Sequence, residues 1–162
     1  MRKFGETGEI DAHLFSLEGK GKQNLRTAVN RAEREGASFE VLPPGSVGPI
    51  AGELKAISDA WLAMHEGAEK SFSLGRFDAA YLDLTPLAVV REGGRIVAFA
   101  NLLPSPGEAA ADLMRHRPDA PHGATDHLFI RCAQWAKAAG LARFALGMAP
   151  LAGLEDRRIA PV

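Results

Sequence analysis

The sequence predicts one α/β domain built on a single mixed β-sheet. The chain has 162 residues, which is the length of one domain. Its apolar residues switch repeatedly between a period of two and a period near 3.6, so strand and helix patterns follow one another. Two β-rich runs flank Gly93-Gly94, and paired glycines supply the positive φ of a tight hairpin turn. A strand-helix-strand unit follows this hairpin, so the sheet should contain both antiparallel and parallel pairs.

In the first part of the chain we expect a short strand within residues 8–17 and then a helix over 19–35. Gly36 should end the helix as a C′ glycine, and residues 37–42 should form the next strand. The helix prediction rests on an apolar stripe at i, i+3, i+4 and i+7. The stripe consists of Leu25, Ala28, Val29 and Ala32.

A second helix is expected over residues 52–65, and one helical turn near 78–82. The hairpin should occupy 86–104, and a further strand 109–116. Thr125 or Asp126 is expected to cap a last helix that runs to Ala139. A final strand should cover 142–148, with irregular structure from Ala149 onward.

Composition excludes several classes of protein. The chain is 46% hydrophobic with a formal net charge of −1, which excludes a disordered chain and a uniformly basic nucleic-acid binder but leaves room for a local basic patch. The single cysteine, Cys132, excludes an internal disulfide and is expected to be a buried thiol. The five histidines lack metal-ligand spacing, so no metal site is expected. No signal peptide or membrane-spanning run is seen, and we expect the chain to be soluble and intracellular.

The order of elements matches the acetyltransferase superfamily, in which the turn before the helix after the central strand usually binds coenzyme A. Here that turn reads "RHRPDAPHGATD" and holds one glycine, Gly123, together with Asp119 and Asp126. Carboxylates at this position would repel a pyrophosphate. We therefore expect that coenzyme A is not the natural ligand, and that no cofactor is used.

Two clusters of charge are candidates for function. Asp112 and Arg115 lie three residues apart, so they reach one face only if the strand bends or ends between them. One interpretation is an exposed ion pair at the end of a strand. The other is a binding site, in which the acid binds an amine and the arginine binds an ester or phosphate oxygen. Lys22, Arg26 and Arg31 lie on the first helix, which is either a solvated face or a contact for a polyanion such as tRNA or anionic lipid.

Four motifs point to a family: "FSLGRFD", "DLMRHRPDAP", "LGMAPL" and the less specific "LRTAVNRAEREG". They resemble the C-terminal region of bacterial phosphatidylglycerol lysyltransferases, also called lysylphosphatidylglycerol synthetases or multiple peptide resistance factors. The resemblance implies the second half of a tandem pair of acetyltransferase-like (GNAT-like) domains. That pair moves an aminoacyl group, usually lysyl or alanyl, from its tRNA to phosphatidylglycerol, which lowers the attraction of cationic antimicrobial peptides.

The resemblance also implies roles for individual residues. Asp112 and Arg115 correspond to active-site residues, and the substrate-binding candidates are Arg76, Asp78, Asn101 and Arg117. Lys22, Arg26 and Arg31 lie on the expected inter-domain helix, where they would contact tRNA or lipid.

Residues 1–162 would form one acyltransferase-like domain, with the basic inter-domain helix within 1–36, and we expect this domain to be a fragment of a larger protein. The family's membrane-spanning region and first acyltransferase domain are absent from it, and so is an aromatic and lysine-rich C-terminal segment. The full-length protein is expected at the cytoplasmic face of the bacterial inner membrane. Two other functions stay open: an acyl-CoA N-acetyltransferase, and a non-catalytic tRNA- or lipid-binding module. The amino acid carried and the oligomeric state are also open.

Overall fold

The computed structural model describes residues 5–65 and 76–150. Its centre is a six-stranded sheet with the order β1-β6-β5-β4-β3-β2, in which only the β5–β6 pair is parallel. The strands are β1 (Gly5–Asp11), β2 (Ala37–Leu42), β3 (Leu87–Glu92), β4 (Arg95–Ser105), β5 (Glu108–His116) and β6 (Arg143–Pro150). The helices are η1 (Lys20–Lys22), α1 (Gln23–Arg34), η2 (Gly48–Ile50), α2 (Ala51–Met64), α3 (Ala79–Leu82) and α4 (Ala124–Ala138). The predicted mixed α/β sheet is confirmed.

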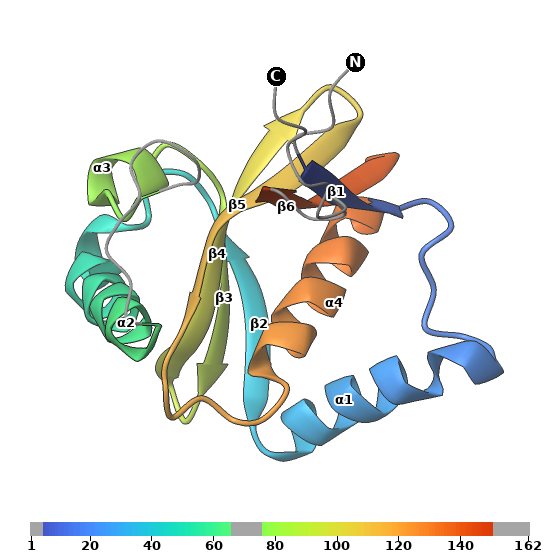
Figure 1. Ribbon diagram of the computed structural model, residues 1–162, viewed down its shortest axis with the longest axis horizontal. Coiled ribbons are helices and arrows are strands. Elements are labelled where there is room, and N and C mark those ends of the chain that lie inside the picture. The colour runs from blue at the N-terminus through green and yellow to red at the C-terminus, as the bar shows by residue number, and fades with distance from the viewer. Residues whose placement is uncertain (1–4, 66–75, 151–162) are drawn as a thin grey trace, which may run out of the picture.

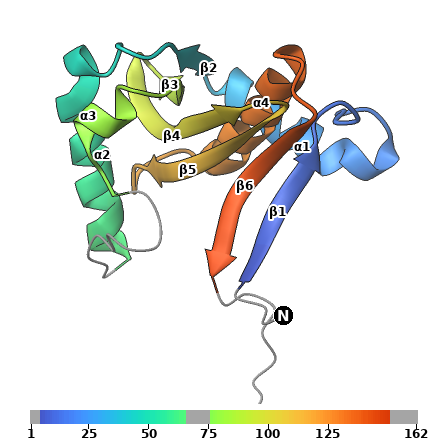
Figure 2. The same ribbon diagram turned by 90° about the horizontal axis from the view of Figure 1, so that it is seen from above.

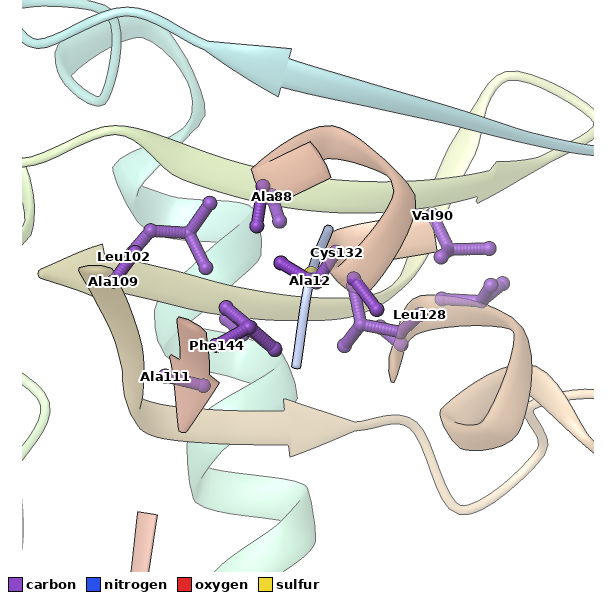
Figure 3. Close-up of a cluster of buried hydrophobic side chains, with 14 residues drawn as sticks. Ala12, Ala88, Val90, Leu102, Ala109, Ala111, Leu128, Cys132 and Phe144 are labelled. Atoms are coloured by element: carbon purple, nitrogen blue, oxygen red, sulfur yellow. The ribbon is translucent and has the colours of Figure 1, made fainter. Parts of the chain in front are cut away.

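Helices cover both faces of the sheet (Figure 1). Helices α2 and α3 lie on one face, which we call the α2 face, and α4 lies on the other, the α4 face, with α1 packed against it. Each face has its own hydrophobic cluster. The cluster of the α4 face includes Leu128, Cys132 and Phe144 (Figure 3), and that of the α2 face includes Leu54, Ile57 and Phe99.

The β3–β4 hairpin forms as predicted. Glu92 pairs with Arg95 across the turn, and Gly93 and Gly94 have φ values of 57° and 81°. Both values fall in the region that favours glycine, so the paired glycines are what make a two-residue connection possible here.

Strands β5 and β6 separate soon after they begin. Their parallel pairing covers three residue pairs, from Glu108–Arg143 to Ala110–Ala145, although β5 continues to His116. Figure 2 shows the two strands diverging. Helix α4, which connects them, packs against both. The predicted splaying of the last two strands beside this helix is therefore observed.

Several predicted boundaries were wrong. Helix α4 begins at Ala124, and its N-cap is Gly123 at a φ of 90° with no side-chain cap, so neither Thr125 nor Asp126 caps it. Both residues fall inside the first turn because the left-handed glycine turns the chain one residue earlier. Helix α1 begins at Gln23, after the short η1, rather than at residue 19. Strand β6 runs to Pro150 because β1 pairs with it as far as the Gly5–Pro150 pair, so irregular structure does not begin at Ala149.

Cys132 is buried, as predicted, and burial raises the pKa of its thiol to about 12. Within residues 5–65 and 76–150, no group of His, Cys, Asp or Glu side chains is arranged to hold a metal ion. None of the helices in these two ranges is both long enough and apolar enough to cross a bilayer.

Candidate functional site

A β-bulge in β5 changes which face its side chains occupy. Ala100 of β4 pairs with Met114, and Leu102 pairs with Ala111. Between these pairs β4 has one residue, Asn101, whereas β5 has two. An extra residue in one strand shifts the alternation of its side chains from that point onward.

The bulge places Asp112 and Arg115 on the same face of the sheet. Asp112 contacts Tyr81 of α3, and Arg115 covers the ring of Trp61 in α2, so both side chains lie on the α2 face. Ala111 and Met114, in contrast, pack into the cluster of the α4 face. The shared face results from the bulge at residues 112 and 113, whereas we expected the strand to bend or end between Asp112 and Arg115.

Asn101 holds the bulge in place. Its side chain is fully buried, and its Oδ1 accepts a hydrogen bond of 2.7 Å from the backbone N–H of Leu113. The bulge takes this N–H out of the regular ladder, and a buried N–H without a partner would be costly. This contact occupies the amide oxygen of a residue that we predicted to bind substrate.

Asp112 accepts a hydrogen bond from a tyrosine of the helices that cover the α2 face. The Tyr81 hydroxyl donates a hydrogen bond of 3.0 Å to Asp112 Oδ2. Burial raises the pKa of Tyr81, as do this hydrogen bond and the negative charge of Asp112, while the amide of Asn101 has a smaller, opposite effect. Tyr81 is therefore a hydrogen-bond donor in the neutral pH range, and not a general base.

Asp78 and Arg76 lie just before α3. Asp78 is the N-cap of this helix, and its Oδ1 accepts hydrogen bonds from the backbone N–H groups of Ala80 at 3.0 Å and Tyr81 at 3.2 Å. Arg76 lies 3.7 Å from the other carboxylate oxygen of Asp78 and is well exposed. Both residues are thus adjacent to the element that carries Tyr81. Their substrate-binding role stays a prediction.

Arg115 lies against an aromatic pair. Its guanidinium carbon is 4.1 Å from the centroid of the Trp61 ring, which suits a cation–π contact. The His65 ring stacks on Trp61 at a centroid distance of 4.0 Å. The flat face of Trp61 therefore holds the guanidinium on the α2 face, which also carries Asp112.

Arg117, another predicted substrate ligand, connects three elements. Its Nε donates to the carbonyl oxygen of Ile96 at 2.7 Å, and its Nη2 lies 3.3 Å from Glu53 Oε1. Glu53 Oε1 also accepts the N–H of Ile96 at 2.9 Å. These contacts join α2 to the start of β4 and the end of β5. A direct role of Arg117 with substrate stays a prediction.

The three basic residues of the first helix have different surroundings. Arg26 donates to the carbonyl oxygens of Leu17 and Gly19, and Arg31 pairs with Glu35 at 2.9 Å. Lys22 is exposed at the start of α1. Because a helix turns by about 100° per residue, Arg26 and Arg31 differ by about 140° around its axis. Arg26 and Arg31 therefore do not form one continuous patch. The contact of Lys22, Arg26 and Arg31 with tRNA or lipid stays a prediction.

The turn before α4 borders a hollow of about 260 Å³ lined by Arg117, His122, Gly123 and Asp126, among others. Asp119 is not one of its lining residues and pairs with Arg95 at 3.1 Å. The repulsion that we expected against a pyrophosphate therefore rests on Asp126. The expectation that coenzyme A is not the ligand stays a prediction.

Sequence reasoning missed Tyr81 and Trp61, the two aromatic residues that contact the candidate pair. Trp61 lies within the helix expected over residues 52–65 and Tyr81 within the helical turn expected near 78–82, and the sequence predicted no functional role for either. One signal was present: Tyr81 is the only tyrosine in the chain and directly follows the "FSLGRFD" motif region. Its approach to Asp112 depends on long-range folding, which the motif does not encode.

Known proteins are similar to this chain in sequence and in fold. Residues 1–162 match the family described as "Phosphatidylglycerol lysyltransferase, C-terminal". The chain is 48% identical over 155 residues to the phosphatidylglycerol lysyltransferase of Bacillus subtilis, covering 94% of this chain and 18% of that protein. It is 40% identical to the solved structure of L-PGS from Bacillus licheniformis, with a TM-score of 0.86, covering 99% of this chain and 49% of that one.

A more distant likeness concerns the fold alone. A glucosamine N-acetyltransferase region of a fungal multi-domain protein is 11% identical, with a TM-score of 0.59, and the match covers 88% of this chain and 18% of that one. This likeness confirms the predicted acetyltransferase fold. The chain spans about a fifth of the length of the curated relatives it matches. Because the family model matches residues 1–162 and the two relatives above are 40% identical or more, the chain belongs to the phosphatidylglycerol lysyltransferase C-terminal family.

Proposed function

We propose that this chain is the C-terminal acyltransferase-like part of a protein that transfers an aminoacyl group from aminoacyl-tRNA to phosphatidylglycerol. Membership of the family supports the reaction class. The observation that carries the proposal is the presence of Asp112 and Arg115 on one face of the sheet, each held by an aromatic residue of the covering helices.

In the proposed reaction, a hydroxyl oxygen of the lipid glycerol attacks the carbonyl carbon of the aminoacyl ester. The bond from that carbon to the tRNA ribose oxygen breaks, and the hydroxyl proton ends on the ribose oxygen. One ester replaces another, so the step needs neither an oxidant nor further activation. Positioning and charge stabilisation supply most of the rate enhancement.

The two charged residues have complementary tasks. The Asp112 carboxylate binds the ammonium group of the aminoacyl moiety, and the Arg115 guanidinium stabilises the oxygen that becomes negative in the tetrahedral intermediate or a phosphate oxygen. Of the four substrate-binding candidates, Arg76 and Asp78 line the aminoacyl pocket. Asn101 and Arg117 support the strands that carry the reacting face, through the contacts to Leu113 and Glu53.

The remaining parts of the proposal concern partners and place. Lys22, Arg26 and Arg31 would contact the phosphates of tRNA or anionic lipid. An N-terminal acyltransferase domain and membrane region of the same protein would complete the enzyme. Because aminoacyl-tRNA is a cytoplasmic substrate, transfer would occur at the cytoplasmic face of the bacterial inner membrane.

The test uses the full-length protein that contains this sequence. Phosphatidylglycerol vesicles are incubated with lysyl-tRNA or alanyl-tRNA, and the lipid products are measured. A parallel calorimetric titration uses acetyl-CoA. We expect an aminoacylated lipid from at least one tRNA and no saturable binding of acetyl-CoA. Micromolar binding of acetyl-CoA without lipid product would favour the acetyltransferase, and tRNA or vesicle binding without product would favour the non-catalytic module.

A further inference from the structure

We propose that Tyr81 is a positioning residue for Asp112: its hydroxyl fixes the orientation in which the carboxylate meets the amine of the aminoacyl group. The inference rests on the proposed function and adds a residue to it. The hydrogen bond joins residues 31 apart in the chain, from α3 to β5, at a part-buried position. A terminal carboxylate rotates broadly around its last torsion, so a fixed donor narrows the orientations that it samples.

The helix that carries Tyr81 is anchored at both ends. Asp78 caps its first turn through two backbone N–H groups. At the other end, Asp83 Oδ1 accepts the N–H of Val47 at 2.7 Å, and the Asp83 carbonyl accepts the N–H of Gly45 at 2.8 Å. Leu82, next to Tyr81, is fully buried in the cluster of the α2 face. A helix of four residues would not be stable alone, so these contacts give Tyr81 a defined position.

The charge state of Tyr81 suits this task. Burial and the negative charge of Asp112 raise its pKa, so the hydroxyl stays protonated beside the carboxylate. The phenol can then only support Asp112, since it has neither the charge nor the basicity to replace it. Loss of the Tyr81 hydroxyl should therefore slow aminoacyl transfer only because Asp112 is no longer held in position.

The first test measures the contact without using activity. Tyr81 is the only tyrosine in the 162-residue chain, so ultraviolet absorbance of tyrosinate reports its ionisation alone. We expect Asp112→Asn to lower the pH at which Tyr81 ionises in this chain, because the nearby negative charge is lost. Circular dichroism at each pH shows that the chain is still folded. An unchanged ionisation midpoint in the folded variant would overturn the contact, and with it the inference.

The second test measures its consequence in the full-length protein. We expect Tyr81→Phe to lower kcat for aminoacyl transfer by about 10-fold, the size of one hydrogen bond to a charged group, with KM for the lipid unchanged. In an Asp112→Ala background the same change should have no further effect. Thr85→Val is the matched control, because it removes a neighbouring hydroxyl that bonds to the Leu82 carbonyl and does not touch Asp112.

The outcomes separate this inference from the proposed function. A full kcat in Tyr81→Phe, an equal loss in both backgrounds, or an equal loss in Thr85→Val would overturn the positioning role. Absence of transfer by the wild-type protein would instead refute the proposed function. In that case the tyrosine titration still decides whether Tyr81 holds Asp112.

Discussion

The two faces of the sheet differ in how they use polar residues, although the same strands form both. The α4 face is closed by small and apolar residues of β4 and β5, such as Ala98, Ala109 and Ala111, which allow α4 to pack closely. The α2 face carries Asn101, Asp112 and Arg115 among its apolar residues. The α4 face therefore mainly supplies stability, whereas the α2 face also holds polar residues through the contacts of Asn101, Asp112 and Arg115.

The bulge in β5 separates these two functions within a single strand. Without the extra residue, strict alternation would direct Asp112 and Arg115 to opposite faces. One of the charges would then lie against α4 in the apolar cluster, where burial of a charge is costly. The bulge therefore keeps the α4 face apolar and collects both charges on the α2 face.

The largest expected effect on stability is on the α4 face. Phe144 is fully buried there, so Phe144→Ala should lower the free energy of unfolding by about 3–5 kcal/mol. Leu14→Ala, at a residue that is 79% exposed, should change it little. Urea unfolding of both variants measures this. A Phe144→Ala variant with near wild-type stability would contradict the role given to the α4 face.

A smaller stability effect, joined to a loss of function, is expected at the bulge. Asn101→Ala leaves the buried N–H of Leu113 without its acceptor, which should cost about 1–3 kcal/mol. The bulge should also shift, so transfer should fall more than the lost stability explains. Asn30→Ala, at an exposed residue, is the control for the measurements of stability and of transfer. If Asn101→Ala lost stability but kept full transfer at a temperature where it is folded, the link between bulge and function would be wrong.

The smallest effect is expected on the surface of α1. Lys22→Gln and Arg31→Gln should each weaken tRNA binding modestly and reduce the slope of log affinity against log salt by about 1. Stability should change by about 0.5 kcal/mol or less, since the Arg31–Glu35 pair is exposed. Lys55→Gln is the matched control, because Lys55 forms an exposed i, i+4 pair with Asp59 on the opposite layer. An equal change in Lys55→Gln would show that the binding is not specific to α1.

Much of the fold could be predicted from the sequence because local patterns determine it. The Gly93-Gly94 turn, the apolar stripe of α1 and the order of strands and helices were all visible in the sequence. The start of α4 was misplaced because Thr125 and Asp126 are common cap residues, whereas the left-handed conformation of Gly123 depends on the path of the preceding loop.

The candidate site was predictable only in part. The motif "DLMRHRP" indicated Asp112 and Arg115, but their shared face depends on a bulge that Asn101 fixes from a neighbouring strand. Tyr81 of α3 and Trp61 of α2 lie on the same face, and no local sequence pattern predicts their contacts with Asp112 and Arg115. Long-range contacts of this kind are absent from residue spacing, so the partners of the charged pair could be found only in the structure.

We propose that the charged pair on the α2 face carries out aminoacyl transfer, and the rate of lipid aminoacylation measures that role. Asp112→Ala and Arg115→Ala in the full-length protein should each lower turnover by about 100-fold or more, the size expected when one transition-state contact is removed. A parallel melting curve should show a stable fold. Near-normal turnover with a stability change below about 1 kcal/mol is what an exposed ion pair would give, and it would rule out a catalytic role for Asp112 and Arg115.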